Sequence, residues 1–289
     1  MAEDQPLIFV DAQQVWRVTA FIGEGAFGQV HRVIRNGRTG RDHEGAAKVA
    51  KDSGDLRNEL EIYQRIANRS NFLPSLWDHG IDDQSEFIIL SLEGMDLDRV
   101  YETAPNHYIP PGDLYYFAYN GFKALESLHT FDIVHRDIKP NNVVYGITSG
   151  KAELVLIDLG YAQFVPTVEG VRIYPPSDDM LFRHRWGSIR MMEHGAHTEL
   201  DDVHMMLYTI LDIALVFDPY VPFAERLQRK REIMENPERA LTHLQQFFVP
   251  LITAVSNLNY ASLPNYASIF AAIEVMGNII NADEEYMWI

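Results

Sequence analysis

The stretch HRDIKPNN, at positions 135–142, places an acid, two cations and two carboxamides beside a proline. The core of a helix or a strand would not select this mixture for packing, so its reason is chemical. Asp137 could orient an attacking hydroxyl group and accept its proton, while Asn142 could hold a metal ion. Lys139 could neutralise charge on a phosphoryl group during its transfer. The stretch therefore indicates a catalytic loop for phosphoryl transfer.

The tripeptide DLG places Asp158 sixteen residues after Asn142, where an apolar run ends. A carboxylate at that point could bind Mg²⁺ that bridges the β- and γ-phosphates of ATP. Because Mg²⁺ takes few protein ligands, one aspartate and one asparagine are sufficient. DLG alone is more typical of an ordinary turn, and it gains meaning from its distance to the catalytic loop.

A glycine-rich stretch, GEGAFGQV at 23–30, fits the pattern G-x-G-x-x-G-x-V. Glycines let backbone amides approach phosphates without obstruction by side chains. Alone, the pattern fits an ordinary glycine hairpin equally well. A dinucleotide-binding fold would need a helix directly after it, whereas a second strand follows here through Val30 and Val33. The pattern therefore favours a phosphate-covering flap between two strands.

A lysine and a glutamate farther along the chain could complete a nucleotide site. Lys48, in the next predicted strand, could reach the α- and β-phosphates of a nucleotide if a carboxylate held it in place. We choose Glu59 for that carboxylate because it lies beside the apolar stripe of the following helix, whereas Glu61 points away from that stripe. Taken singly, an exposed lysine and a solvated helix face would explain each residue more simply.

The elements that must position these residues fall into two groups. The first is strand-rich: hydrophobic patterning predicts two strands within 16–34, a third at 46–50, a helix at 55–67 and a strand at 86–92.

The second group is mainly helical. A long helix capped by Asp113 leads into the catalytic loop, a small hairpin ends at Asp158, and the chain beyond 199 is mostly helical. We therefore divide a single domain into an N-lobe at 1–93 and a C-lobe at 94–289.

The composition excludes several classes of function. A balance of 24 basic and 41 acidic residues gives a net charge of −17, which would repel nucleic acid and anionic membranes. The absence of cysteine excludes disulfides, thiolate catalysis and cysteine-ligated zinc, and no histidine spacing suggests a metal site. We find neither a secretory signal nor an apolar run long enough to span a bilayer. We expect an intracellular monomer of the cytoplasm or nucleus, without nucleic-acid or membrane partners.

Together these residues resemble the eukaryotic protein kinase family, from about Trp16 to at least residue 235. HRDIKPNN is similar to the catalytic loop of serine/threonine kinases, in which a lysine stands two residues after the aspartate. Within that family the chain looks most like the casein kinase 1 group, including its tau-tubulin kinase branch. ELEIY at 59–63 and SIRMMEHGAHTELDD at 188–202 support this resemblance.

The resemblance implies a bilobal α+β fold, with a small antiparallel sheet and one main helix in the N-lobe and a larger helical C-lobe. It implies ATP and Mg²⁺ as cofactors, Asp137 and Lys139 as catalytic residues, and Asn142 and Asp158 as metal ligands. Asp202 would brace the catalytic loop, although a simple helix cap explains it almost as well. The implied nucleotide-binding residues are Ile22, Gly23, Gly25, Gly28, Val30, Ala46, Lys48, Glu59, the gatekeeper Leu90, and the hinge residues Ser91 and Glu93.

The resemblance also suggests a substrate class. Arg185, in RHRWGS, corresponds to an arginine that the casein kinase 1 group uses to bind an acidic or phosphorylated substrate residue. The basic stretch ERLQRKRE could add Arg226 or Arg229 to this anion site, although a solvated helix face explains that stretch equally well. We therefore expect protein substrates with acidic or phosphorylated segments.

The chain departs from the family pattern in its activation segment, which runs from Gly160 to Gly187. FRHRWGS, at 182–188, is two residues shorter than its counterpart, and the missing Gly-Thr would normally brace Asp137 and Lys139. Thr167, Tyr174 and Ser177 could be phosphorylated and pair with Arg136, although the resembled group generally lacks such a switch.

Three functions remain open. The first is an active serine/threonine kinase; the second is a pseudokinase that binds nucleotide or acts as a scaffold; the third is a small-molecule phosphotransferase. We favour the first because every residue that the chemistry requires is present, whereas a chain that had abandoned it would usually have lost one. The third would not explain the resemblance over 182–202.

Overall fold

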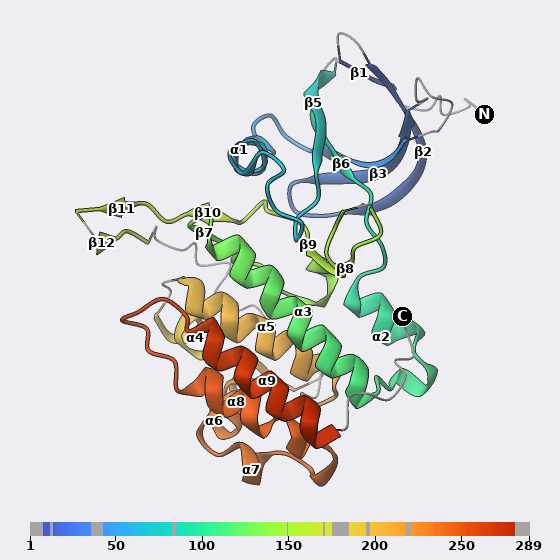
Figure 1. Ribbon diagram of the computed structural model, residues 1–289. Coiled ribbons are helices and arrows are strands. Elements are labelled where there is room, and N and C mark those ends of the chain that lie inside the picture. The colour runs from blue at the N-terminus through green and yellow to red at the C-terminus, as the bar shows by residue number, and fades with distance from the viewer. Residues whose placement is uncertain are drawn as a thin grey trace.

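The chain folds into a small sheet-rich lobe above a larger helical lobe (Figure 1). The computed structural model describes residues 8–11, 14–35, 43–82, 85–148, 150–169, 171–174, 185–194, 197–217 and 221–280. The predicted bilobal α+β fold is confirmed. No helix in these ranges is long and apolar enough to cross a membrane.

The N-lobe is built on a six-stranded antiparallel sheet in the order β1-β2-β3-β4-β6-β5. Its helix, α1, covers Arg57–Ile66 and packs beside the sheet (Figure 1). The strands are β1 (Ile8–Asp11), β2 (Gln14–Glu24), β3 (Gly28–Arg35), β4 (His43–Ala50), β5 (Leu76–Asp82) and β6 (Ser85–Ser91). The glycine-rich stretch joins β2 to β3, as the sequence predicts.

Alternation along β4 decides which side chains face the cleft. Ala47 belongs to a compact N-lobe cluster with Trp16, Val33, Phe87 and Ile89. Its neighbours in the chain must point to the opposite face, because successive side chains of a strand alternate. The antiparallel register then pairs Val30 with Lys48 and Ala46 with Leu90. Val30, Ala46, Lys48 and Leu90 consequently share one face of the sheet.

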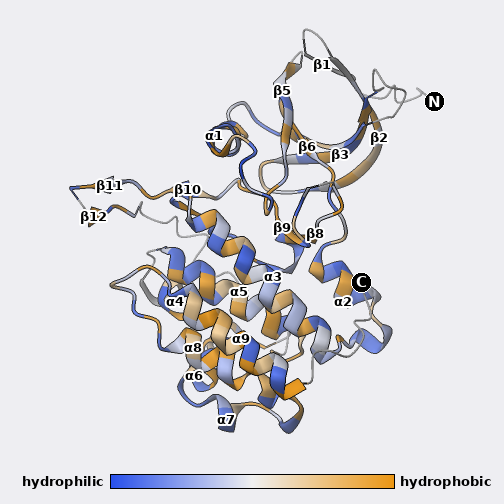
Figure 2. Cartoon of the chain, in the orientation of Figure 1, coloured by the Kyte–Doolittle hydropathy of each residue, from blue (hydrophilic) through white to orange (hydrophobic). Residues whose placement is uncertain are grey.

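The C-lobe is organised around helix α5 (Glu199–Ile213), of which nearly every residue is buried. Its N-cap is Thr198, which forms a reciprocal capping box with Asp201. Helix α3 (Pro111–His129) packs against both α5 and α9 (Tyr266–Ile280). In Figure 2 the helices of this lobe mix hydrophobic and hydrophilic residues, as expected for helices with one buried face.

The remaining elements of the C-lobe are short helices and strand pairs. The helices are α2 (Leu97–Thr103), α4 (Ile189–His194), α6 (Phe223–Glu235), α7 (Pro237–Ala240) and α8 (Val249–Ser256), with 3₁₀ turns at Pro105–His107, Pro140–Asn142 and His243–Phe248. The strands are β7 (Ile133–Val134), β8 (Val143–Tyr145), β9 (Leu154–Leu156), β10 (Gln163–Phe164), β11 (Thr167–Val168) and β12 (Val171–Arg172).

One predicted helix boundary is wrong. The sequence suggested Asp113 as the N-cap of α3, but this helix begins at Pro111 with Pro110 as its N-cap, so Asp113 is a buried residue of the first turn. Proline fits the first helical position because its missing N–H would have no partner there, and its fixed φ suits a helix.

Candidate active site

A cavity of about 370 Å³ lies between the two lobes. Every residue that the sequence implicated in nucleotide or metal binding lines it: Ile22, Gly23, Gly25, Gly28, Val30, Ala46, Lys48, Glu59, Leu90, Ser91, Glu93, Asn142 and Asp158. Leu92, inside the predicted hinge, lines it too, and Pro74, Asp96, Val144 and Ile157 also contribute to the lining. The last four come from loops and from the β8–β9 hairpin, where sequence patterning carried no signal for a site.

Lys48 is held by carboxylates from both lobes. Its Nζ lies 2.7 Å from Glu59 Oε2 on α1 and 2.7 Å from Asp158 Oδ1 beyond β9. Burial alone would lower the pKa of Lys48, but the two carboxylates outweigh burial and raise that pKa above its ordinary value. The ammonium group is therefore charged at neutral pH and fixed at the inner end of the cavity.

Glu59 also contacts the DLG segment directly. Its Oε1 accepts a hydrogen bond of 3.3 Å from the backbone N–H of Leu159. The Glu59 side chain is 1% exposed, whereas Glu61 is exposed to solvent. Glu59 therefore ties helix α1 both to Lys48 and to the DLG segment.

The carboxylate of Asp137 is fixed by two neighbours in the catalytic loop. Its Oδ2 accepts hydrogen bonds from Lys139 Nζ at 2.7 Å and from Asn142 Nδ2 at 2.9 Å. Asn142 Nδ2 also donates to the Asp137 carbonyl oxygen at 2.8 Å. The sequence predicted that Asp137 and Lys139 would lack a brace because FRHRWGS is short, and residues 182–184 of that stretch lie outside the described ranges. Within the catalytic loop itself, Lys139 and Asn142 hold the Asp137 carboxylate.

Asp202 anchors the backbone of the catalytic loop from inside α5. Its Oδ2 accepts from the His135 N–H at 2.6 Å and its Oδ1 from the Arg136 N–H at 2.9 Å. Nε2 of His129 and Nε2 of His197 lie 3.1 and 2.8 Å from the same carboxylate. Burial alone would raise the pKa of Asp202, but the two histidines hold it well below its ordinary value. Asp202 is thus a brace inside the helix rather than its cap.

Two residues of the site adopt left-handed backbone conformations. Arg136 has φ = 71° and Asp158 has φ = 62°. Such a conformation costs a non-glycine residue about 1–3 kcal/mol, so the surrounding structure must enforce it. The Asp202 carboxylate holds Arg136 in this conformation by accepting a hydrogen bond from the Arg136 backbone N–H. Lys48 holds the side chain of Asp158.

His135 fills the space between the catalytic loop and the DLG segment. It is fully buried, and burial lowers the pKa of its imidazole. The neutral ring donates from Nε2 to the Ile157 carbonyl oxygen at 3.1 Å, while its Nδ1 accepts from the Asp137 N–H at 3.4 Å. These two bonds assign the tautomer and link the strand before Asp158 to the backbone of Asp137.

The hinge between the lobes is fastened by its glutamate. Glu93 Oε1 accepts from Ser91 Oγ at 2.7 Å, and its Oε2 accepts from the backbone N–H groups of Ile147 and Thr148 at 3.1 Å each. The side chain of Glu93 therefore holds the turn after β8. Sequence reasoning assigned this residue only to nucleotide binding.

The tip of the glycine-rich loop carries an aromatic side chain that the sequence analysis did not single out. The ring of Phe27 packs edge-on against Tyr161 with a centroid distance of 4.7 Å. A Cβ atom at Gly160 would lie 2.4 Å from the Phe27 ring. The loop is therefore closed over the DLG segment, and glycine at position 160 leaves room for this closure.

The predicted anion-binding arginines have internal partners. Arg185 forms an ion pair with Asp212, which also accepts from Trp186 Nε1 at 3.0 Å. Arg185, Trp186 and Asp212 line a pocket of about 300 Å³ that also includes Asn141 of the catalytic loop. The structure thus brings Arg185 next to the catalytic loop but partly neutralises its charge.

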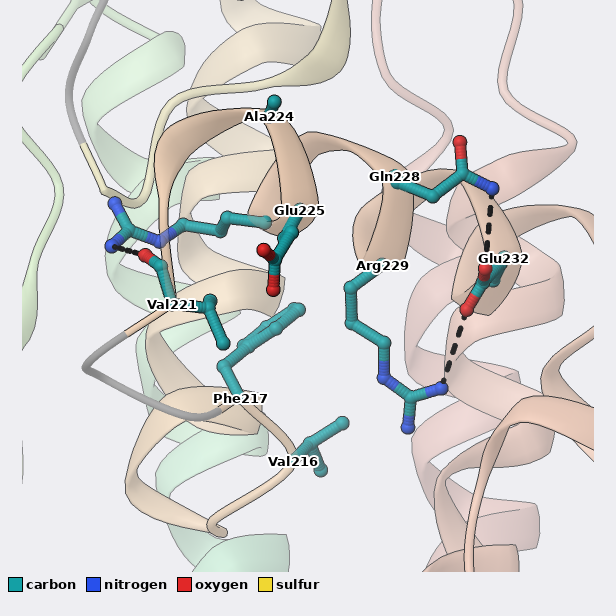
Figure 3. A pocket seen from close by; sticks show the side chains of 9 residues that line it. Val216, Phe217, Val221, Ala224, Glu225, Gln228, Arg229 and Glu232 are labelled. Carbon is teal, nitrogen blue, oxygen red and sulfur yellow. Dashed lines mark hydrogen bonds and ion pairs between the residues drawn. The ribbon is translucent and has the colours of Figure 1, made fainter.

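Arg226 does not line that pocket. Its Nη2 donates to the Val221 carbonyl oxygen at 3.1 Å, and burial together with the charge of Arg185 lowers the pKa of its guanidinium. It contributes instead to a second cavity of about 570 Å³ at the end of α5 and along α6 (Figure 3). In that view Arg229 and Glu232 face each other beside the apolar floor of Val216 and Phe217. This cavity lies apart from the catalytic residues.

Comparisons with known proteins show which proteins the chain is similar to. The protein kinase domain family matches residues 16–235. A putative casein kinase I from Caenorhabditis elegans is 26% identical over 206 residues, covering 69% of this chain and 60% of that protein. Nucleosomal histone kinase 1 from Drosophila melanogaster is 22% identical over 294 residues, covering 90% of this chain and 47% of that protein. The chain thus spans less than two thirds of the length of these relatives.

A solved structure supports the fold. The structure of vaccinia related kinase 3 matches with a TM-score of 0.72 at 18% identity, covering 97% of this chain and 93% of that one. At this identity the match shows a shared fold.

Proposed function

The chain belongs to the protein kinase family, and we propose that it is a serine/threonine protein kinase that transfers the γ-phosphate of Mg-ATP to protein hydroxyl groups. The observation that carries this proposal is the assembly of two polar networks at one cleft. Lys48 is paired with Glu59 and Asp158, and Asp137 is held by Lys139 and Asn142. A chain that only bound nucleotide would not need the second network.

The residues present fit Mg²⁺. The nitrogen of the Asn142 carboxamide is used by Asp137, so its oxygen is the atom that remains for a metal ion. Together with the Asp158 carboxylate it offers the oxygen ligands that Mg²⁺ prefers. A bound Mg²⁺ would shield the negative charge of the phosphates. Within the described ranges no cluster of three or more histidine, aspartate or glutamate side chains could hold a metal, and Mg²⁺ does not require one.

The cleft also fits ATP. Ala46, Val30 and Leu90 offer apolar surface for an adenine ring, and the backbone of the hinge lies beside them. Lys48 and the glycine-rich loop offer positive charge and free approach to the phosphates. These roles are proposals that rest on the shape and chemistry of the cavity.

The catalytic loop is arranged for proton acceptance. The Asp137 carboxylate would accept the proton of a substrate hydroxyl group while Lys139 and Asn142 fix its orientation. The Lys139 side chain is 26% exposed, so its ammonium group can also face an incoming phosphoryl group. Asp202 supports this arrangement by holding the backbone of the loop.

We further propose that the substrates carry acidic or phosphorylated residues, as in the casein kinase 1 group. Arg185 lies in a pocket beside Asn141, and Arg226 adds positive charge near it. Asp212 offsets part of this charge, so the preference should be modest. We also propose that the N-lobe ends at residue 93 and the C-lobe begins at residue 94. The proposal includes a monomer located in the cytoplasm or nucleus, without nucleic-acid or membrane partners.

The metal assignment can be tested with two matched substitutions. Asp158→Asn should weaken Mg-ATP binding by at least about tenfold, because even residues behind a metal ligand are worth that much. Asp96→Asn is the control, since Asp96 lines the same cavity and asparagine preserves its role as the N-cap of α2. Calorimetric titration with ATP, with and without Mg²⁺, measures both. Equal Mg²⁺ dependence in the two variants would contradict the assignment.

A further inference from the structure

The activation segment carries a hairpin, β11–β12, that projects away from the body of the molecule (Figure 1). Its Val168 and Val171 side chains are 55% and 61% exposed, so the hairpin has little packing of its own. Isolated two-stranded hairpins are marginal in water. The contacts at its base must therefore determine where the segment lies.

Arg172, the last residue of β12, makes the contacts that join this base to the C-lobe. Its Nη1 lies 2.7 Å from Asp132 Oδ1, and its Nη2 pairs with Glu199 Oε1. Asp132 belongs to the turn before β7, and Glu199 is the first residue of α5. One guanidinium group thus bridges two carboxylates from separate elements through two different nitrogens, a fork geometry that the single nitrogen of a lysine would not reproduce.

Glu199 depends on this contact. Its side chain is 1% exposed, and a buried carboxylate without a cation is costly. Its other oxygen accepts a hydrogen bond of 2.6 Å from Tyr174 Oη. Burial and the Glu199 charge raise the pKa of Tyr174 to about 12, so the phenol remains a donor at neutral pH. Arg172, Asp132, Glu199 and Tyr174 form one cluster, which we name the base clamp.

Two residues of the base clamp lie close in the sequence to the residues that hold the catalytic loop in place. Asp132 lies three residues before His135, and its carbonyl oxygen accepts from the Val165 N–H at 2.8 Å. Glu199 lies three residues before Asp202, which binds the backbone of His135 and Arg136. Placement of the activation segment is therefore linked to the elements that place Asp137.

We infer that Arg172 is a positioning residue that fixes the activation segment with a permanent charge, in the role that an added phosphate plays in switched kinases. This inference rests on the proposed function and replaces the expectation that phosphorylated residues of the segment pair with Arg136. Arg136 donates instead to the Tyr161 carbonyl oxygen at 3.4 Å. A phosphate on Tyr174 would face the Glu199 carboxylate and would loosen the clamp.

The test compares the full-length wild type with Arg172→Ala, Arg172→Lys and Asp132→Asn, with Arg239→Ala as the control. Arg239 is an exposed arginine on α7, so its substitution makes the same chemical change far from the clamp. Hydrogen–deuterium exchange over residues 163–174 measures segment placement without requiring activity. Peptide kcat and KM, and the affinity for Mg-ATP, are measured on the same proteins.

Arg172→Ala should raise exchange and lower peptide kcat/KM, each by about tenfold or more, as expected when a buried charge loses its partner. Its affinity for Mg-ATP should stay within about twofold of the wild type, since no clamp residue lines the nucleotide cavity. Arg172→Lys and Asp132→Asn should be intermediate, because each retains one bridge. Asp132 is exposed, so its variant keeps the test valid if Arg172→Ala fails to fold.

Phosphatase treatment of the wild type should change neither exchange nor kcat/KM. A loss of kcat/KM after this treatment, or Arg172→Ala exchange equal to that of Arg239→Ala, would overturn the inference. If the wild type transfers no phosphate, the proposed function fails while the exchange measurements still decide on the clamp.

Discussion

Lys48 is the residue at which the two lobes meet electrostatically. Its carboxylate partners come from α1 in the N-lobe and from the DLG segment in the C-lobe. Loss of either partner would leave a buried charge with half of its compensation, which is expensive in a low-dielectric site. The relative placement of α1 and the DLG segment should therefore depend on this lysine and its partners.

The two glutamates of α1 provide a matched pair for testing this dependence. Glu59→Gln should weaken Mg-ATP binding by about tenfold and lower the free energy of unfolding by about 1–3 kcal/mol, because a buried charged partner is lost. Glu61→Gln should change both by little, since Glu61 is exposed. Nucleotide titration and urea unfolding measure the two quantities. Equal effects of the two substitutions would contradict the importance of the Lys48–Glu59 pair.

Asp202 gives the protein a specific dependence on pH. Its pKa in the folded protein lies well below the value of about 3.9 expected in an unfolded chain. At acid pH the unfolded state consequently binds more protons, so the stability that Asp202 supplies is complete above about pH 4 and is lost as the pH falls further. Asp202→Asn should destabilise the protein strongly at pH 7 and progressively less toward pH 3.

Urea unfolding of the wild type and Asp202→Asn between pH 3 and pH 7 measures this dependence. Asp52→Asn, at an exposed aspartate, serves as a control for general charge effects. A stability difference between wild type and Asp202→Asn that is the same at pH 3 and pH 7 would show that the carboxylate of Asp202 does not stabilise the fold through its charge.

At the scale of elements, the glycine-rich loop shows why its glycines are not equivalent. A Cβ atom at Gly28 would lie 2.2 Å from the carbonyl oxygen of Val49 on β4, whereas a Cβ atom at Gly25 would meet nothing within 4 Å. Gly28 is thus required by the packing of β3 on β4. Gly25 leaves open the space over the cavity.

Alanine substitutions should separate these two roles. Gly28→Ala should destabilise the N-lobe by about 1–3 kcal/mol, because its Cβ would force two strands apart. Gly25→Ala should leave the melting temperature nearly unchanged and alter only nucleotide affinity. Thermal unfolding and ATP titration distinguish the outcomes. A larger loss of stability in Gly25→Ala would contradict this assignment.

Local patterning was sufficient to predict most of the elements that carry the site. Alternation around the glycines predicted β2 and β3, and helical spacing near Leu56 predicted α1 and the inward direction of Glu59. The start of α3 was missed because an aspartate before an apolar run resembles a cap, and the preceding prolines gave the better signal.

Contacts between distant elements could not be read from local patterning. Glu93 holds the turn at Ile147 and Thr148, and Arg172 pairs with Asp132. Because these partners lie about 40 or more residues apart, neither contact produces a periodic pattern in the sequence. The pairing of Arg185 with Asp212 is a third case, because the sequence suggested Arg185 for an external anion. Such partners depend on the packing of helices and loops far apart in the chain.

At the scale of the whole molecule, the arrangement is that of a kinase domain with both lobes and the cleft between them. The net charge of −17 makes local groups of cations, such as those around Arg185, stand out as places where an acidic substrate segment would be attracted. The comparisons cover 60% of the casein kinase I relative and 47% of nucleosomal histone kinase 1, so they concern only part of each protein. The central claim therefore concerns the chemistry of the domain itself.

The most direct test of that claim is Mg²⁺-dependent transfer of the γ-phosphate of ATP to an acidic protein, compared between the wild type and Asp137→Asn. We predict transfer by the wild type and a rate about 10²–10⁴-fold lower in Asp137→Asn, the usual contribution of a positioned proton acceptor. Mg-ATP should raise the melting temperature of both proteins equally. If ATP stabilises both but neither transfers phosphate, the catalytic loop serves only nucleotide binding or scaffolding, and the proposed kinase activity is contradicted.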